Sequence, residues 1–163
     1  MNILTIPVLI ILLDQISKLY IKFNFSLYQK YDLLGSFIRI FYIENSGIAF
    51  GIDTSSFHLI ITVLTISAII VIGYYLFLLV KEDKLEKYSI ALILGGAIGN
   101  CIDRILVLFP VSGYKGVIDF IDIGFGHTRW YIFNFADAAI TCGVLFYFFI
   151  AYKSKYNLDD QGN

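Results

Sequence analysis

Residues 59–80 read LIITVLTISAIIVIGYYLFLLV, a run without a charged side chain. One helical crossing of a bilayer needs about 20 consecutive apolar residues, and this run has that length. Three further apolar blocks of similar length lie at residues 3–23, 88–108 and 130–152, and each of them contains at least one ionisable residue. The sequence therefore predicts an all-α membrane protein with four transmembrane helices.

The composition supports the same class of protein. Of the 163 residues, 58% are hydrophobic and 15% are charged, and the mean hydropathy is +0.77. A water-soluble domain of this length has fewer apolar and more charged residues. The formal net charge of -1 argues against a nucleic-acid surface. The first block lacks the basic segment of a secretory signal, so we expect one integral membrane domain over residues 1–163.

Four spans place both termini on one side of the membrane. The loop at residues 81–87 and the polar tail at 154–163 lie on that side, and the loops at 24–58 and 109–129 lie on the other. Lys and Arg are equally numerous on both sides but denser in the short loop and tail, which favours a cytoplasmic position for these two segments. Residues 37–43, FIRIFYI, predict a strand of a small surface sheet, although their aromatic side chains also suit an interfacial belt.

The ionisable and polar residues of the spans gather at one depth. Spans one and three run outward and span four runs inward, so these residues fall within about two helical turns of one another along the membrane normal. They are Asp14, Lys18, Asn100, Asp103, Arg104 and Asp137. Charged groups are costly at membrane depth and usually mark function there. A buried network that only holds the helices together is the alternative.

Asp119 and Asp137 suggest acid–base chemistry. Two carboxylates held close together share one proton, so the ionised one can take a proton from water while the protonated one hydrogen-bonds a scissile carbonyl. We interpret the two residues as an aspartic dyad, with Asp122 as the rival for either role. In a strand, Asp119 and Asp122 would face opposite ways. Asp137 would also suit the first turn of a helix with Asn134 as its N-cap, because an anion there interacts favourably with the helix dipole.

Other catalytic centres find little support. His58 and His127 lie at membrane edges and outside any recognisable nucleophile motif. Carboxylates without convergent histidines would make an unusual zinc site, so we expect neither a metal nor a cofactor. A transporter or proton relay that uses its intramembrane carboxylates to carry ions remains an alternative, and a membrane scaffold without catalysis is another.

Five short motifs follow one another along nearly the whole chain. They are residues 14–18 (DQISK), 45–51 (NSGIAFG), 95–104 (GGAIGNCIDR), 117–122 (VIDFID) and 133–137 (FNFAD). In these motifs and their order, the chain resembles the bacterial lipoprotein signal peptidases, also called signal peptidase II. It departs from the family at Ile48, where a small residue such as alanine is common.

The resemblance implies an intramembrane aspartic endopeptidase of the bacterial cytoplasmic membrane. Such an enzyme removes the signal peptide from prolipoproteins, cutting just before a cysteine that carries a diacylglyceryl group. By the same resemblance, Asp119 and Asp137 are the catalytic dyad. The motif positions that line or support the site are Asp14, Lys18, Asn45, Gly47, Asn100, Asp103, Arg104, Asn134 and Ala136.

The resemblance also carries expectations about topology and partners. Both termini would be cytoplasmic, and the active site would lie toward the outer face of the membrane. A small extracytoplasmic β-cradle and a short surface helix between spans three and four would complete the fold. The expected partners are prolipoprotein substrates, membrane lipids and globomycin-type inhibitors.

Overall fold

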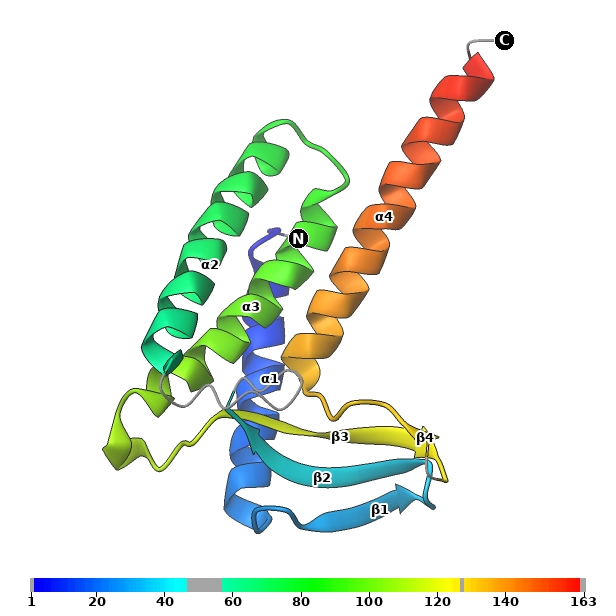
Figure 1. Ribbon diagram of the computed structural model, residues 1–163. Coiled ribbons are helices and arrows are strands. Elements are labelled where there is room, and N and C mark those ends of the chain that lie inside the picture. The colour runs from blue at the N-terminus through cyan, green and yellow to red at the C-terminus, as the bar shows by residue number, and fades with distance from the viewer. Residues whose placement is uncertain (1, 47–56, 127, 162–163) are drawn as a thin grey trace.

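The computed structural model describes residues 2–46, 57–126 and 128–161 (Figure 1). In this part of the chain, four α-helices form a bundle: α1 (Thr5–Asn24), α2 (His58–Lys81), α3 (Lys87–Val107) and α4 (Phe135–Gln161). Helix α3 is central, because it contacts each of the other three. A small sheet lies across one end of the bundle, and the connection between α2 and α3 lies at the opposite end, as does the last turn of α4 (Figure 1). Gly47 and Ile48 of the second motif lie outside the described residues.

Three of the described helices are long and apolar enough to cross a membrane: His58–Lys81, Lys87–Val107 and Phe135–Ser154. Helix α2 leaves much of its apolar surface uncovered. Leu59, Leu64, Ile70 and Val71 each expose between 63% and 67% of their surface. Continuous apolar surface of this kind is unusual on a monomeric protein in water. A bilayer would cover it, and the chain is accordingly a membrane protein.

Helix α1 differs from the other three in its charge. Asp14, Lys18 and Lys22 fall within any stretch of α1 that is long enough to cross a bilayer, so composition alone does not mark this helix as a span. Two of the three charges are buried, however, since Asp14 is 0% and Lys18 is 1% exposed. Their side chains pair with each other over 2.8 Å. The bundle interior, and not the surrounding lipid, therefore receives these charges, as is usual for ionisable residues in membrane helices.

The sheet has four antiparallel strands in the order β1-β2-β3-β4. The strands are β1 (Lys30–Leu34), β2 (Ile38–Asn45), β3 (Val117–Phe125) and β4 (Thr128–Arg129). The strand predicted at residues 37–43 is therefore confirmed as β2. Between β2 and β3 the register shifts, because two residues of β2 lie opposite Phe120, between the pairs Ile40–Ile121 and Ile43–Asp119. This bulge bends β2 directly beside Asp119.

An apolar cluster docks the sheet on the bundle. It joins Ile21 of α1, Tyr42 of β2, and Ile118 and Phe120 of β3, and each of these side chains is at most 6% exposed. Fully burying an apolar side chain stabilises a fold by about 1.5–3 kcal/mol. Because Ile118 and Phe120 flank Asp119, this cluster fixes the strand that carries the carboxylate.

The fourth helix begins at Phe135 and not at residue 130, so its predicted start is corrected. Trp130 donates its backbone N–H to Ile123 over 2.8 Å, and Phe133 donates to Ile121 over 3.1 Å. The apolar residues before α4 therefore extend the sheet. At its other end α4 continues through the polar tail to Gln161. Within the described connection between α3 and β3, the expected surface helix is a single 3-10 turn, η2 (Pro110–Ser112).

Candidate active site

Asn134 caps the N-terminus of α4, as predicted. Its side-chain oxygen accepts the backbone N–H of Asp137 over 2.9 Å, and its own backbone N–H donates to Asp137 Oδ2 over 3.2 Å. This reciprocal pair of hydrogen bonds is a capping box, which satisfies two backbone donors that would otherwise lack partners. It fixes the Asp137 carboxylate in the first turn of α4.

Asp119 of β3 is connected to Asp137 through two amide side chains. Asp119 is only 3% exposed, and its Oδ1 accepts a hydrogen bond of 2.6 Å from the Asn134 amide. The same amide donates to Asn100 Oδ1 over 3.0 Å, and Asn100 Nδ2 donates to Asp137 Oδ1 over 2.7 Å. A further amide, that of Asn45, donates to Asp119 Oδ2 over 3.1 Å. The structure therefore brings the two predicted dyad residues into one hydrogen-bonded network.

Burial and charge together place the titration of Asp119 near neutrality. Burial is the larger cause and the negative charge of Asp137 the next, and together they raise the pKa of Asp119 to about 7. The hydrogen bonds from Asn45 and Asn134 and the charge of Lys18 act in the opposite direction. A carboxyl group of this kind can hold a proton at neutral pH, which a shared-proton pair requires.

Lys18 is the centre of a second buried network. Its Nζ lies 2.8 Å from Asp14 Oδ2 and 3.0 Å from Asp103 Oδ2, and it donates to Asn100 Oδ1 over 2.9 Å. All four side chains are at most 5% exposed. One ammonium therefore faces two carboxylates, and Asn100 links this network to the one that contains Asp119 and Asp137.

Both carboxylates paired with Lys18 also bind backbone next to Asp119 and Asp137. Asp14 Oδ1 accepts the N–H of Ala136, and Asp103 Oδ2 accepts the N–H of Ile118, each over 3.0 Å. Ala136 precedes Asp137, and Ile118 precedes Asp119. The network predicted to share one depth therefore anchors the two elements that carry the carboxylate pair.

Gln15 is part of this network although we did not predict it. Its Nε2 donates to Asp14, to Asp103 and to the carbonyl of Gly99 over 3.0–3.1 Å. Gln15 belongs to the first motif and lies three residues before Lys18, a spacing that places both side chains on one helix face. That spacing is the signal that could have identified it.

Two glycines of α3 allow the helices to approach closely at this point. A Cβ atom at Gly96 would lie 2.3 Å from the carbonyl oxygen of Ala136, and one at Gly99 would lie 2.7 Å from Asp14 Oδ2. Small residues permit such close packing of helices in membranes. Any larger side chain at either position would push α3 away from the elements that carry the site.

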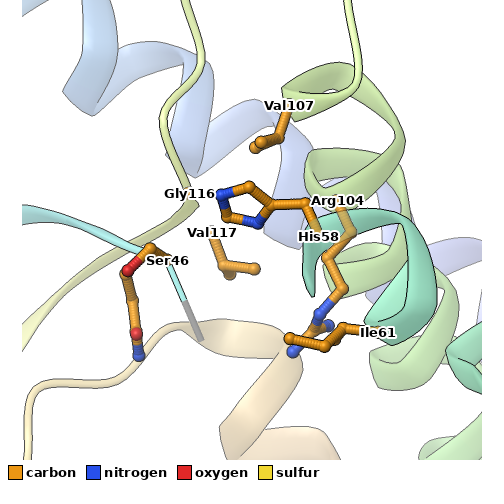
Figure 2. A pocket seen from close by; sticks show the side chains of 8 residues that line it. Ser46, His58, Ile61, Arg104, Val107, Gly116 and Val117 are labelled. Atoms are coloured by element: carbon orange, nitrogen blue, oxygen red, sulfur yellow. The ribbon is translucent and has the colours of Figure 1, made fainter. Parts of the chain in front are cut away.

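Arg104 lies in a neighbouring pocket. The pocket is lined by Asn45, Ser46, His58, Ile61, Arg104, Val107, Gly116 and Val117. Figure 2 shows the side chains of His58 from α2 and Arg104 from α3 on one side of this pocket and Ser46 on the other. Asn45 lines the pocket and also donates to Asp119. Asn45 therefore connects the pocket that contains the predicted residue Arg104 to Asp119.

Asp122 is engaged elsewhere in the sheet. Its Oδ1 accepts a hydrogen bond of 2.6 Å from Nε of Arg129, whose side chain also donates to the carbonyl of Ser36 over 2.8 Å. Asp119 and Asp122 are three positions apart on one strand and point to opposite faces. Asp122 thus serves the pairing of the strands, while Asp119 faces Asn134.

Fold and site together define a helical membrane protein with two linked carboxylates where the bundle meets a small sheet. The model of the signal peptidase (SPase) II family matches residues 6–153. The chain therefore belongs to the signal peptidase II family, which is a family of proteases. This membership favours peptide hydrolysis over the two alternative functions, a transporter and a scaffold without catalysis.

Similar sequences come from distant bacteria. The chain is 37% identical to a lipoprotein signal peptidase of Moorella thermoacetica over 145 residues, which cover 89% of each chain. It is also 37% identical to a lipoprotein signal peptidase of Pelagibacter ubique, over 86% of this chain and 81% of the relative. A lipoprotein signal peptidase of Maridesulfovibrio salexigens is 33% identical over 92% of this chain and 94% of its own. The similarity therefore extends over nearly the whole length of these relatives.

Solved structures of bacterial membrane enzymes share the fold. One, determined by the in meso method at 2.3 Å resolution, superposes with a TM-score of 0.75 and 30% identity, over 96% of this chain and 90% of its own. A second, at 1.9 Å resolution, has a TM-score of 0.72 and 30% identity, over 93% and 92%. The arrangement of bundle and sheet thus agrees with that of membrane enzymes.

Proposed function

We propose that this protein is an intramembrane aspartic endopeptidase that removes the signal peptide from diacylglyceryl-modified prolipoproteins, cutting just before the lipidated cysteine. Membership of the signal peptidase II family supports the substrate class. The observation that carries the mechanism is the amide-linked pair of carboxylates, Asp119 and Asp137, which belong to one hydrogen-bonded network.

The two carboxylates take different roles in the proposed reaction. Asp119, whose pKa is raised to about 7 by burial and by the charge of Asp137, holds the shared proton and hydrogen-bonds the scissile carbonyl oxygen. Ionised Asp137 accepts a proton from the attacking water as the new C–O bond forms. When the tetrahedral intermediate collapses, the C–N bond breaks and Asp137 returns this proton to the leaving amine of the cysteine.

The supporting residues keep the pair in position. Asn100 and Asn134 donate to the carboxylates, while Asp14 and Asp103 bind the backbone beside them. Holding reacting groups in a productive geometry supplies a large part of enzymatic rate enhancement. Arg104, Asn45 and Gly47 complete the set of residues that we assign to the site, and both Asn45 and Arg104 line one small pocket.

The proposed topology has four spans within one integral domain over residues 1–163. Helix α1 would be the additional span, because its central charges are buried against α3 and α4 and need not meet lipid. The termini would lie in the cytoplasm of a bacterium, and the sheet and site would lie toward the outer face of the cytoplasmic membrane. A diacylglyceryl group in the outer leaflet would then bring the scissile bond to the depth of Asp119 and Asp137. Globomycin-type inhibitors would occupy the same site.

The experiment that tests the proposal is mass spectrometry of a diacylglyceryl prolipoprotein incubated with purified protein. The wild type should release the signal peptide with the lipidated cysteine as the new N-terminal residue. Asp119→Asn and Asp137→Asn should each lower the rate by at least about 1,000-fold, because neither an amide donor nor an amide acceptor replaces the missing carboxyl.

Asp122→Asn is the matched control, since it makes the same chemical change on the same strand. It should keep measurable turnover because Asp122 faces Arg129. Undiminished cleavage by either dyad variant would refute the mechanism. Cleavage at another bond would refute the assigned substrate.

A further inference from the structure

Glu44 is the penultimate residue of β2, directly before Asn45, and its carboxylate is almost buried, with 6% of the side chain exposed. Its Oε1 accepts hydrogen bonds from Lys22 Nζ over 2.8 Å and from the Tyr42 hydroxyl over 2.5 Å. Its Oε2 accepts the backbone N–H of Lys115 over 2.7 Å. One carboxylate therefore joins α1, β2 and the segment that leads into β3.

Lys22 strengthens this connection. Besides Glu44, its ammonium donates to the carbonyl of Gly113 over 3.0 Å, and it lies 4.0 Å from the centre of the Tyr114 ring. Hydrogen bonds with charged partners are roughly twice as strong as those between neutral groups. Burial raises the pKa of Glu44, but the hydrogen bonds from Lys22, Tyr42 and the Lys115 backbone outweigh it and leave the pKa below its usual value. Glu44 is thus held as an anion at neutral pH.

The backbone is tightly packed where Asn45 leaves the strand. A Cβ atom at Gly116 would lie 2.4 Å from the carbonyl carbon and oxygen of Asn45. The register pairs Glu44 with Ile118 and Asn45 with Val117. Since the Asn45 amide must reach Asp119 across this junction, its position depends on where the end of β2 is fixed.

We propose that Glu44 is a positioning residue of the active site, which holds the end of β2 so that Asn45 keeps its hydrogen bond to Asp119. The inference rests on the proposed catalytic role of Asp119. Glu44 stands just outside the second motif, and its contacts to three separate elements distinguish it from an ordinary surface carboxylate.

A displaced Asn45 should change the pH dependence in a known direction. The groups that face Asp119 are Asp137, whose charge raises its pKa, and Lys18, Asn45 and Asn134, which lower it. Losing the Asn45 hydrogen bond therefore raises the pKa of Asp119 further and moves the alkaline limb of kcat/KM to higher pH. Removing only the negative charge of Glu44 would move the limb to lower pH. A mere loss of folded protein would lower activity equally at all pH values.

The test compares pH profiles of cleavage for Glu44→Gln, Asn45→Ala and the double variant, using the purified full-length chain and a diacylglyceryl prolipoprotein. We expect Glu44→Gln to lower kcat about tenfold. In both single variants the alkaline limb of kcat/KM should move to higher pH by about one unit. The double variant should be no worse than Asn45→Ala, because both changes act through one hydrogen bond.

Asp32→Asn provides the matched control. It removes a carboxylate that pairs with Arg39 over 2.8 Å in the same sheet, and it should leave the profile unchanged. If Glu44→Gln does not fold, Tyr42→Phe removes one donor to Glu44 without changing charge and should move the limb upward by a smaller amount. The proposal would be overturned if a folded Glu44 or Tyr42 variant kept the alkaline limb of kcat/KM at the wild-type pH. It would also be overturned if the losses of kcat in the two single variants added up in the double variant.

The failure of the proposed function is distinguishable from the failure of this inference. A wild type that does not cleave prolipoprotein, or an Asp119→Asn variant that cleaves normally, would overturn both. If the wild type cleaves and Asp119→Asn does not, the profiles of the Glu44 and Tyr42 variants decide the positioning role alone.

Discussion

Asp14 and Asp103 come from different helices, share the ammonium of Lys18, and bind corresponding backbone positions. Asp14 accepts the N–H of the residue before Asp137, and Asp103 accepts the N–H of the residue before Asp119. The two carboxylates of the pair are therefore held through one cation, which couples the start of α4 to the start of β3.

Replacing that cation should be severe. Lys18→Met leaves Asp14 and Asp103 buried without their counter-ion, and removing one partner of a buried ion pair costs about 3–5 kcal/mol of folding free energy. We expect a markedly lower thermal midpoint in detergent and loss of cleavage. Lys84→Met, which removes a cation from the exposed pair with Glu82, should leave both unchanged. Equal midpoints for the two variants would contradict a structural role for Lys18.

The close contact between α3 and α4 predicts a strong effect of a single methyl group. Gly96→Ala would place a Cβ 2.3 Å from the Ala136 carbonyl oxygen, so the helices must separate next to Asp137. Overpacking of this kind costs about 1–3 kcal/mol, and we expect cleavage to fall with stability. Gly73→Ala in α2 meets no atom within 4 Å and should be neutral or slightly stabilising. Thermal unfolding and cleavage assays of the two variants check the contrast.

Asn134 should contribute to both stability and catalysis. Asn134→Ala removes the N-cap of α4, which costs about 1 kcal/mol, and also the donor to Asp119. Because the carboxylate pair loses its amide link, we expect cleavage to fall about 100-fold. Asn24→Ala makes the same change at an exposed helix end, where the side chain donates to the carbonyl of Tyr20, and it should retain activity. If the rate of cleavage falls only in proportion to the loss of folded protein, Asn134 contributes to stability and not to catalysis.

The raised pKa of Asp119 predicts the pH dependence of the wild type. Cleavage should decline as the pH rises through about 7, because Asp119 then loses the proton that the pair shares. The same shift means that the folded state binds this proton more tightly than the unfolded state does. Its contribution to stability is therefore complete below a pH of about 4 and is lost as the pH rises through about 7. A kcat/KM profile that stays flat to pH 9 would contradict the assignment.

The sequence predicted the helices well where a long run of apolar residues was the only signal needed. The run at residues 59–80 corresponds to α2 (His58–Lys81), and the block at 88–108 to α3 (Lys87–Val107). The start of α4 was wrong because Trp130 and Phe133 are apolar enough for a span, yet their backbone groups bond to β3. Hydropathy does not distinguish an aromatic strand from the first turn of a membrane helix.

The site was predicted from motifs and not from spacing. Asp119 joins the network of Asp137 because the chain returns from β3 through β4 to the cap of α4, a path that the intervening residues do not specify individually. Glu44 was missed for a related reason. Its partner Lys22 is 22 residues away and the Lys115 backbone is 71 residues away, and contacts between distant segments leave no periodic pattern in the sequence.

The division of the carboxylate pair between a strand and a helix has a consequence for biogenesis. Asp137 belongs to an apolar helix, whereas Asp119 lies on a strand whose neighbours Ile118 and Phe120 pack against Ile21 of α1. On the proposed function, a newly inserted chain whose strands are still unpaired would have only one of its two catalytic carboxylates in place. Proteolytic competence would appear last, after the membrane-embedded and surface parts have met, so an immature chain could not cleave neighbouring proteins during its own assembly.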